Sequence, residues 1–379
     1  MTAYPAAGSN AENSLLAQGT SKLSFVNKAV RPVKRIVSRG FEQSRLLGYA
    51  SSSLHRLKTC TLRVYATFFL SFGIYTLLVF LMRKYAMGVS ELSIIHLITG
   101  SALVLMSIPL FFSGKALGEA ILSGVLLRSL LIRAAGLRPE AIGTDGQAGG
   151  RKNIAFIFGM FFGALTFFVS PLLIIGALLS LVAAYIILLS PEFGLIFALF
   201  ITPFLILLSN PTVILCIIVL YTSFCWIIKL VRGKRVLRFD LLDIFVLLFA
   251  AVFLFGGIVS VGGKSSLQAA AVYVCLMLGY FLAANLMNTD KWLRRAIIAL
   301  VSSAFFVSLW GIAQNFFSSS EASWIDTKMF SNISVRVTSA FENPNMLAEY
   351  LIILFPLALA LLLRSHNAPT ALSRISICG

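Results

Sequence analysis

Long, almost uncharged apolar runs separated by short polar breaks dominate the chain from Tyr65 onwards. Each run holds about the 20 residues that a helix needs to cross roughly 30 Å of hydrocarbon. A membrane barrel would instead show alternating segments of about ten residues, so the pattern predicts helices. We expect ten spans, at about residues 65–82, 92–112, 153–169, 172–190, 193–209, 212–228, 241–259, 267–287, 296–317 and 346–363.

Three of the breaks between expected spans contain a proline, at Ser170-Pro171, Pro191-Glu192 and Asn210-Pro211. Proline has no backbone N–H and clashes with the turn before it, so it stops one helix. It also suits the first turn of the next helix, where that N–H would lack a partner in any case. The sequence therefore predicts tight turns between helices at these three points.

The composition agrees with a lipid-embedded chain. Of the 379 residues, 59% are hydrophobic and 12% are charged, against about 45–50% and 25% in soluble domains. The mean hydropathy is +0.93. These values exclude an ordinary soluble protein and an intrinsically disordered one. We predict an all-α fold, a polytopic integral membrane bundle of about ten transmembrane helices.

The positions of the charges predict how the chain is oriented in the membrane. The net charge is +17, from 31 Lys and Arg against 14 Asp and Glu. Cytoplasmic loops are enriched in Lys and Arg. Ten spans with both termini in the cytoplasm leave 26 of the 31 basic residues inside and five outside. The charge is thus explained by membrane topology, and we expect no nucleic-acid partner.

Residues 1–64 form a basic N-terminal arm with ten Lys or Arg residues against Glu12 and Glu42. One interpretation is that membrane lipids hold the arm, since each basic residue near anionic headgroups contributes about 1 kcal/mol. The alternative is a flexible basic tail that only fixes topology. Both remain open.

The stretch 116–137 is apolar enough to suggest an eleventh span. However, charges such as Glu119 and Arg128 interrupt it, and a central charge costs roughly 2.5–3.5 kcal/mol on insertion. We interpret it as an interfacial helix on the cytoplasmic surface, within a cytoplasmic segment 113–152 whose glycine-rich end, 138–152, is a loop.

The expected outer loop, 318–345, is much longer than the other outer turns, and long loops are often functional. It leads into the last span through Asn343-Pro344-Asn345. Asn343 is suited to accept hydrogen bonds from the first N–H groups of that helix. A helix N-terminus favours anions, and the guanidinium of Arg336 matches phosphate oxygens.

Glu349 lies four residues after Asn345, on the same face of the expected helix and just inside the outer interface. An acidic residue at that depth is a functional candidate. The alternative is that Arg336 pairs with Glu342 or Glu349 and only pins the loop. The residues alone leave both possibilities open.

Other candidate chemistry is sparse. His96 lies in the second expected span, either as a hydrogen-bonded packing residue or as a ligand or proton relay. The five cysteines form no CxxC pair, and we expect neither a disulfide framework nor a zinc site. Four glycines inside spans, Gly73, Gly159, Gly163 and Gly176, predict close helix packing.

Two motifs resemble the bacterial O-antigen ligase and polymerase family: RVTSAFENPNMLAEYL at residues 336–351 and GIAQNFF at residues 311–317. The basic link, the Phe239-Asp240 helix start and the outer turn at 260–266 follow in the same order as in that family. The resemblance covers residues from about 150 to the end and covers the basic arm poorly.

The resemblance implies a lipid-linked glycosyltransferase (GT-C-like) fold in the bacterial inner membrane. It implies an enzyme that transfers or polymerises a glycan from undecaprenyl pyrophosphate on the outer face, without a metal. The donor and partner is then a lipid-linked oligosaccharide. Arg336 corresponds to an arginine that holds the donor pyrophosphate, and we include Asn343, Asn345 and Glu349 as substrate-binding candidates.

The chain departs from the family in one respect. The family uses a second arginine and a catalytic histidine in a later outer loop, and this chain ends at Gly379, after a short expected cytoplasmic tail, 364–379. His366 falls on the wrong side of the membrane, so we assign no catalytic residue. We expect a truncated or incomplete enzyme, which leaves open whether this chain is itself an enzyme.

Two other functions remain open from the sequence. One is a transporter or flippase of a lipid-linked saccharide. Transporters commonly show charged residues deep in a span and an inverted repeat, and neither is seen here. The other is a non-catalytic membrane assembly protein, which the missing histidine loop keeps in consideration.

Overall fold

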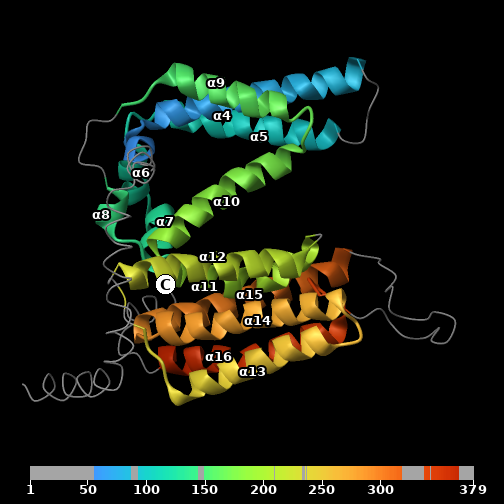
Figure 1. Ribbon diagram of the computed structural model, residues 1–379. Coiled ribbons are helices and arrows are strands. Elements are labelled where there is room, and N and C mark those ends of the chain that lie inside the picture. Colours follow the sequence, from blue (N-terminus) through green and yellow to red (C-terminus); the bar gives the residue numbers. More distant parts are fainter. Residues whose placement is uncertain are drawn as a thin grey trace, which may run out of the picture. The chain divides into compact units, whose positions relative to one another are not determined.

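Figure 1 shows the computed structural model of the chain. It describes residues 55–86, 93–143, 149–208, 210–232, 235, 237–317, 337–341 and 343–366. Most of the basic arm, most of the 318–345 loop and the end of the tail therefore lie outside the described residues. In the described part, only helices, turns and two isolated backbone bridges occur, which confirms the all-α prediction there.

The chain divides into two compact units. One consists of residues 1–53 and 226–237, and the other of residues 54–225 and 238–379. The helices described below belong to the second unit, except that α12 (Pro211–Val231) runs from the second unit into the first.

Eight helices in the described part are long and apolar enough to cross a membrane. One of the eight is α12. The other seven are α4 (Leu62–Leu81, continued by η1, Met82–Ala86), α5 (Ser93–Phe111), α10 (Pro171–Leu189), α13 (Leu241–Val259), α14 (Lys264–Leu286), α15 (Asp290–Phe317) and α16 (Pro344–His366). Their side chains are largely exposed: even Ile98 and Phe255 are 62% and 68% exposed. Such apolar surface is stable in hydrocarbon and unfavourable in water.

The other two expected spans are shorter helices. Residues 153–169 correspond to α9 (Lys152–Leu165), of 14 residues. Residues 193–209 correspond to α11 (Pro191–Ile201), which continues as the 3-10 helix η3 (Thr202–Leu207). Pro203 explains that change, because proline cannot donate the next α-helical hydrogen bond. The count of ten spans therefore stays a prediction.

The three proline breaks are confirmed. Pro171, Pro191 and Pro211 are the first residues of α10, α11 and α12. Pro344 begins α16 in the same way. The fixed backbone of proline thus suits the first position of these four helices.

Close helix packing at glycine is confirmed for α4 against its two neighbours, α5 and α9 (Figure 1). A Cβ on Gly73 would lie 2.7 Å from Val104 of α5, and one on Gly163 would lie 2.5 Å from the Cβ of Tyr75. A Cβ on Gly159 would meet the carbonyl oxygen of Phe68. At Gly176, in contrast, nothing lies within 4 Å, so the prediction was wrong there.

A small apolar core joins these helices to α10. Phe72, Leu103 and Ile174 are buried at its centre. Nearby, His96 of α5 is 1% exposed, and its Nε2 lies 3.0 Å from the carbonyl oxygen of Thr166, just past the end of α9. This geometry matches the interpretation of His96 as a hydrogen-bonded packing residue.

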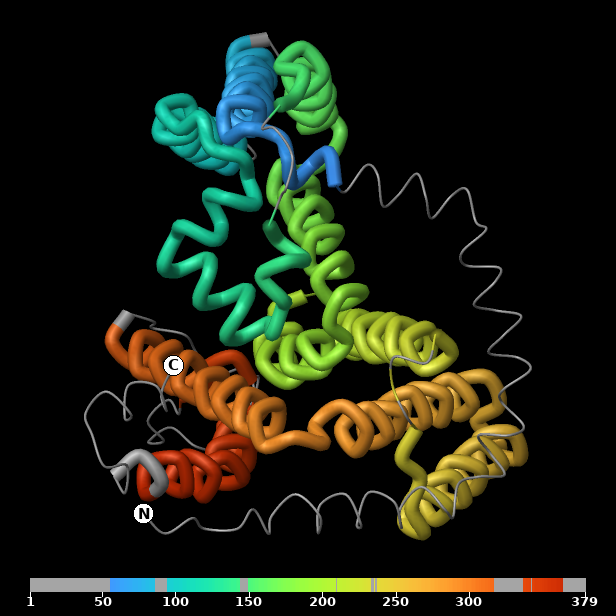
Figure 2. The backbone as a smooth tube through the Cα atoms, turned by 90° about the vertical axis from the view of Figure 1, so that its left-hand side faces the viewer, coloured from blue at the N-terminus to red at the C-terminus, as the bar shows by residue number. Residues whose placement is uncertain are grey.

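Further along the chain, α13 packs on α14, α11 packs on α15, and α16 packs on α15. Figure 2 shows α16 beside α15. A capping box starts α13: the backbone N–H of Asp240 donates to the Asp243 carboxylate at 2.6 Å, and the Asp240 side chain caps the first turn in return. This confirms the helix start expected after Phe239.

The expected interfacial helix at 116–137 is not one helix. The stretch forms α6 (Leu117–Ser123), α7 (Val125–Arg128) and the π-helical turn η2 (Ser129–Ala134). Gly124 interrupts it with an extended backbone, φ −79° and ψ 123°. A short helix, α8 (Pro139–Ile142), follows in what was expected to be loop. Glycine is a poor helix former, which explains why the helical stretch breaks at Gly124.

Candidate functional site

The candidate site lies where α15 ends and α16 begins. Arg336, the proposed phosphate ligand, and Glu342 lie outside the described residues. The description resumes at Val337, the residue after Arg336 in the chain, and covers residues 337–341 and α16. Those residues define the local geometry of the site.

Asn343 caps α16 as the sequence predicts. Its Oδ1 accepts a hydrogen bond from the backbone N–H of Asn345 at 2.8 Å. The side chain thereby satisfies one of the four N–H groups that a helix start leaves without a partner. The N-terminal end of α16 keeps its partial positive charge, which favours an anion nearby.

Asn345 and Glu349 are both exposed on α16. Their spacing of four residues places them on one helix face. The structure therefore brings Asn343, Asn345 and Glu349 together at the first turns of one helix.

Residues 338–341 form a β-turn ahead of α16, in which the backbone N–H of Phe341 donates to the carbonyl oxygen of Thr338 at 3.0 Å. Ser339 has a positive φ of 54°, a conformation that non-glycine residues adopt at a cost of about 1–2 kcal/mol. Its hydroxyl donates to the carbonyl oxygen of Val307 in α15. That hydrogen bond helps to hold the backbone in this conformation.

Gln314 of α15 binds the same turn with its whole amide group. Its Oε1 accepts hydrogen bonds from the backbone N–H groups of Ser339 at 2.7 Å and Thr338 at 3.3 Å. Its Nε2 donates to the Thr338 hydroxyl at 3.3 Å. The end of α15 is therefore fixed to the segment that follows Arg336 in the chain.

Gly311, one turn before Gln314, allows this close approach. A Cβ at Gly311 would lie 3.0 Å from Val337 and 3.5 Å from the Cβ of Ser339. Val337 also lines a groove of about 430 Å³, together with Leu347 and Leu351 of α16. The groove is mainly apolar and lies directly beside the turn.

A polar chain of contacts connects α16 to α11 through α15. The Tyr350 hydroxyl donates to Ser303 Oγ at 3.0 Å, and Ser303 Oγ donates to the carbonyl oxygen of Phe200 at 2.8 Å. Ser303 is fully buried, so these bonds form away from water. The Tyr350 ring also packs on Phe341 with ring centroids 5.2 Å apart. The turn and three helices thus form one connected unit.

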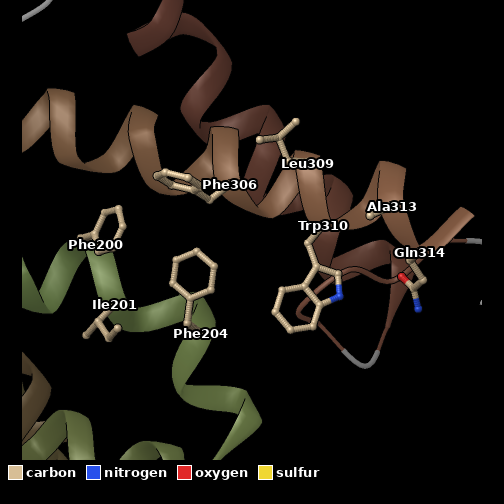
Figure 3. A pocket seen from close by; sticks show the side chains of 8 residues that line it. All are labelled: Phe200, Ile201, Phe204, Phe306, Leu309, Trp310, Ala313 and Gln314. Carbon is tan, nitrogen blue, oxygen red and sulfur yellow. The ribbon is translucent and has the colours of Figure 1, made fainter. Parts of the chain in front are cut away.

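A second groove, of about 720 Å³, opens between α15 and the α11–η3 segment. Figure 3 shows Trp310 and Gln314 projecting from the same helix, with Phe204 facing Phe306 across the groove. Its lining is almost entirely aromatic or aliphatic, with one amide: Phe200, Ile201, Phe204, Phe306, Leu309, Trp310, Ala313 and Gln314. Such a surface fits hydrocarbon and offers little to a polar ligand.

The buried carboxylates lie elsewhere. Glu192 and Asp243 are 2% and 3% exposed, and each lies in the first turn of its helix. In the described ranges, no three His, Cys, Asp or Glu residues come together as a metal site would require. Asp243 accepts a hydrogen bond from the backbone N–H of Asp240 at the start of α13, and Glu192 accepts one from the Ser190 hydroxyl at 3.2 Å.

Sequence reasoning missed Gln314, Ser339 and the Tyr350–Ser303 pair. A signal was present for Gln314, because an amide near the end of a 28-residue, largely apolar helix needs a partner; the neighbouring Asn315 carries the same signal. No comparable signal marks Ser339, since the backbone conformation of a loop serine cannot be read from its residue type.

No protein-family model, curated protein or solved structure matches the chain significantly. The class of the protein therefore follows from the helices themselves. It is a polytopic membrane-embedded protein that is helical throughout its described ranges, with a fixed junction between the last two described helices.

Proposed function

We propose that the chain is a membrane glycosyltransferase of the O-antigen ligase and polymerase type, or a segment of one. It binds undecaprenyl-pyrophosphate-linked glycan beside the α15–α16 junction, at the outer face of a bacterial inner membrane. Arg336, Asn343, Asn345 and Glu349 are the proposed donor-binding residues, and the donor pyrophosphate is held without a metal.

The observation that carries this proposal is the set of three hydrogen bonds between the Gln314 amide and residues 338 and 339, which we call the Gln314 clamp. Arg336 precedes Val337, whose side chain lies in contact distance of the Gly311 position on α15. A guanidinium attached to a fixed backbone segment stabilises an anion better than one on a free loop, because less reorganisation is needed. The capped N-terminus of α16 adds a second positive field within a few residues.

The chemistry of transfer explains why positive charge is needed there. An acceptor hydroxyl attacks the first carbon of the glycan and gives its proton to a base, a role that no residue of this chain is assigned, and the bond from that carbon to pyrophosphate breaks. The pyrophosphate leaves with the electron pair, so negative charge develops on its oxygens. Fixed donors at that position lower the barrier, because they interact more strongly with the transition state than with the bound donor.

The apolar grooves beside the junction also support the proposal. A polyprenyl carrier has a long hydrocarbon chain and an anionic head, so its site must join apolar surface to positive charge. The groove lined by Val337, Leu347 and Leu351 borders the turn that follows Arg336. Apolar surface and the proposed phosphate ligand are thus neighbours in the chain.

The direct test is donor binding by the Arg336→Ala variant. We expect binding of a photoreactive undecaprenyl-pyrophosphate-linked glycan to fall by at least ten-fold, because a charge-assisted contact to phosphate is lost. Insertion into the membrane should be unchanged. The matched control is Lys328→Ala, which removes a basic residue from the same loop. Equal losses in both variants, or near-normal binding in Arg336→Ala, would remove Arg336 from the donor site.

Topology offers a separate test. A cysteine at Ser319 should react with an impermeant thiol reagent added outside intact cells, and one at Gly233 should not. Labelling at Gly233 and not at Ser319 would put the proposed donor site on the wrong face.

A separate assay distinguishes the transporter alternative. Movement of the lipid-linked saccharide across the membrane without any transfer would support a transporter instead.

A further inference from the structure

The segment between α5 and α9 is fixed to the bundle at its start. Leu62, the first residue of α4, donates its N–H to the carbonyl oxygen of Lys115 at 2.9 Å. Leu117, the first residue of α6, donates to the carbonyl oxygen of Cys60 at 2.9 Å. Ala116 between them is fully buried. The start of the segment is therefore joined to the N-terminal end of α4.

A second attachment lies at the N-terminal end of α15. Arg295 Nη2 donates to the carbonyl oxygen of Ile132 at 3.1 Å, and its guanidinium stacks over the Trp292 ring, 4.4 Å from the centroid. Gly136 has a φ of +67°, and a Cβ there would collide with the Trp292 ring. Glycine suits this position for two reasons: it adopts the positive φ easily, and it leaves room for the indole ring of Trp292.

A small core completes the attachment. Ala135, Leu137 and Ile142 are buried against Ile186 and Leu189, at the C-terminal end of α10, and Phe193, at the start of α11. The segment is thus fixed to the start of α4, α11 and α15 and to the end of α10. Because one segment contacts all four, these helix ends are neighbours at one end of the bundle.

One part of the segment is left uncovered. The tip, which we define as residues 125–130, follows the break at Gly124. Val125 and Leu126 are 83% and 85% exposed, and Leu127 and Leu130 are more than half exposed. Directly after the tip, Leu131 and Ile132 are partly buried, and Ala135 and Leu137 are buried. The tip is therefore a local apolar projection on a firmly held base.

Two exposed arginines accompany the tip. Arg128 lies within it, and Arg133 lies one turn after it on η2. Adjacent large apolar residues flanked by arginine are typical of segments that enter the boundary between headgroups and acyl chains. The apolar side chains reach hydrocarbon, while the long arginine side chains extend back to the phosphates.

We propose that the 125–130 tip inserts into the membrane surface and binds anionic phospholipid through Arg128 and Arg133. The occupant is a lipid leaflet rather than a protein, because the tip is attached at helix ends, the level at which a bundle meets the headgroups. Positive charge beside it complements anionic lipid. The inference does not depend on the glycosyltransferase proposal.

Photo-crosslinking of the otherwise native chain tests this. The photoreactive residue p-benzoylphenylalanine replaces Leu126, and the protein is irradiated in nanodiscs that contain equal amounts of phosphatidylglycerol and phosphatidylcholine. We expect adducts with the mass of one phospholipid. Phosphatidylglycerol adducts should exceed phosphatidylcholine adducts roughly five-fold, and the double variant Arg128→Gln/Arg133→Gln should lose that preference.

The matched control places the same photoreactive residue at Glu140, which is exposed on α8 of the same segment. It should give few lipid adducts. Equal lipid labelling at both positions, or no lipid adduct at Leu126, would overturn the insertion. Adducts between two copies of the chain would assign the tip to a protein interface instead. An unchanged lipid preference in the double variant would refute the role of the arginines.

Discussion

Gln314 and Ser339 are joined by a hydrogen bond of 2.7 Å between the side-chain oxygen of one and the backbone nitrogen of the other. They lie 25 residues apart in the sequence: Gln314 is near the end of α15, and Ser339 is in the last part of the 318–345 loop. The bond fixes the chain entering α16 to the end of α15. If Arg336 binds a phosphate, this contact determines how well the adjoining backbone is held.

Replacing Gln314 with alanine should therefore weaken donor binding indirectly. The variant loses three hydrogen bonds to the 338–339 backbone and hydroxyl, each worth about 0.5–1.5 kcal/mol. We expect donor binding to fall by about ten-fold, measured with the photoreactive lipid-linked glycan. Gln314→Glu should keep the turn in place, because a carboxylate still accepts from both N–H groups, but its negative charge should itself weaken binding of an anionic donor.

Gln268→Ala is the control, since Gln268 is an exposed glutamine on α14. It should bind the donor normally. A lower midpoint of thermal unfolding in detergent for Gln314→Ala would indicate a general structural role for Gln314. Normal binding in Gln314→Ala would show that the clamp does not matter for the donor, whatever the role of Arg336.

Replacing Ser339 with alanine or with glycine should change the stability of the protein by different amounts. Ser339→Ala loses the hydroxyl bond to Val307 and keeps the unfavourable positive φ. Ser339→Gly loses the same bond but adopts that φ at no steric cost. We expect the alanine variant to be less stable than the glycine variant by about 1 kcal/mol, measured as the free energy of unfolding. Equal stabilities, or a more stable alanine variant, would contradict a left-handed backbone at this residue.

Cysteines at Gly311 and Ser339 should form a disulfide. The Cβ built at Gly311 lies 3.5 Å from the Cβ of Ser339, within the 3.5–4.5 Å that disulfides require. In a chain whose native cysteines are replaced, oxidation should give an intramolecular link, seen after protease cleavage in the 318–336 loop. The control pair is Gly256 with Ser339, because nothing lies within 4 Å of Gly256. Linking of the control pair alone would contradict the junction geometry.

The sequence predicts those features that depend on one residue type with a strong local preference. Pro171, Pro191 and Pro211 start helices because proline restricts its own backbone. Asn343 caps α16 because its side chain reaches the backbone N–H of the second residue of that helix. These effects need no knowledge of distant parts of the chain.

Features that depend on distant partners could not be predicted. Gln314 is fixed by a turn 24 residues later, and Gly176 lacks the neighbour that Gly159 has, although both are glycines in apolar helices. The candidate site shows the same limit. The resemblance suggests Arg336, the pattern of the helix start suggests Asn343, Asn345 and Glu349, and only the structure shows the Gln314 contacts to residues 338 and 339.

The two glycines Gly159 and Gly176 provide a matched pair for helix packing. A Cβ at Gly159 would collide with the carbonyl oxygen of Phe68, whereas the space beside Gly176 is open. Gly159→Ala should destabilise the protein by about 1–3 kcal/mol through overpacking. Gly176→Ala should be neutral or stabilising by up to about 1 kcal/mol, since alanine is the better helix former. Thermal unfolding in detergent measures both, and equal destabilisation by the two variants would contradict the close contact of α4 with α9.

Cys60 should react slowly with alkylating reagents near neutral pH. Burial raises the pKa of the Cys60 thiol, since the uncharged form is favoured away from water. Only the thiolate is nucleophilic, so a raised pKa leaves less of it at a given pH, about ten-fold less for each pH unit below the pKa. We would measure the rate of alkylation by iodoacetamide as a function of pH, by mass spectrometry of the Cys60 peptide. The control is a cysteine substituted at the exposed Glu140. The rate at Cys60 should keep rising with pH after the rate at the control cysteine has levelled off. A Cys60 profile that levels off at the same pH as the exposed cysteine, or at a lower one, would contradict the burial of the thiol against Gly150 and the α4 start.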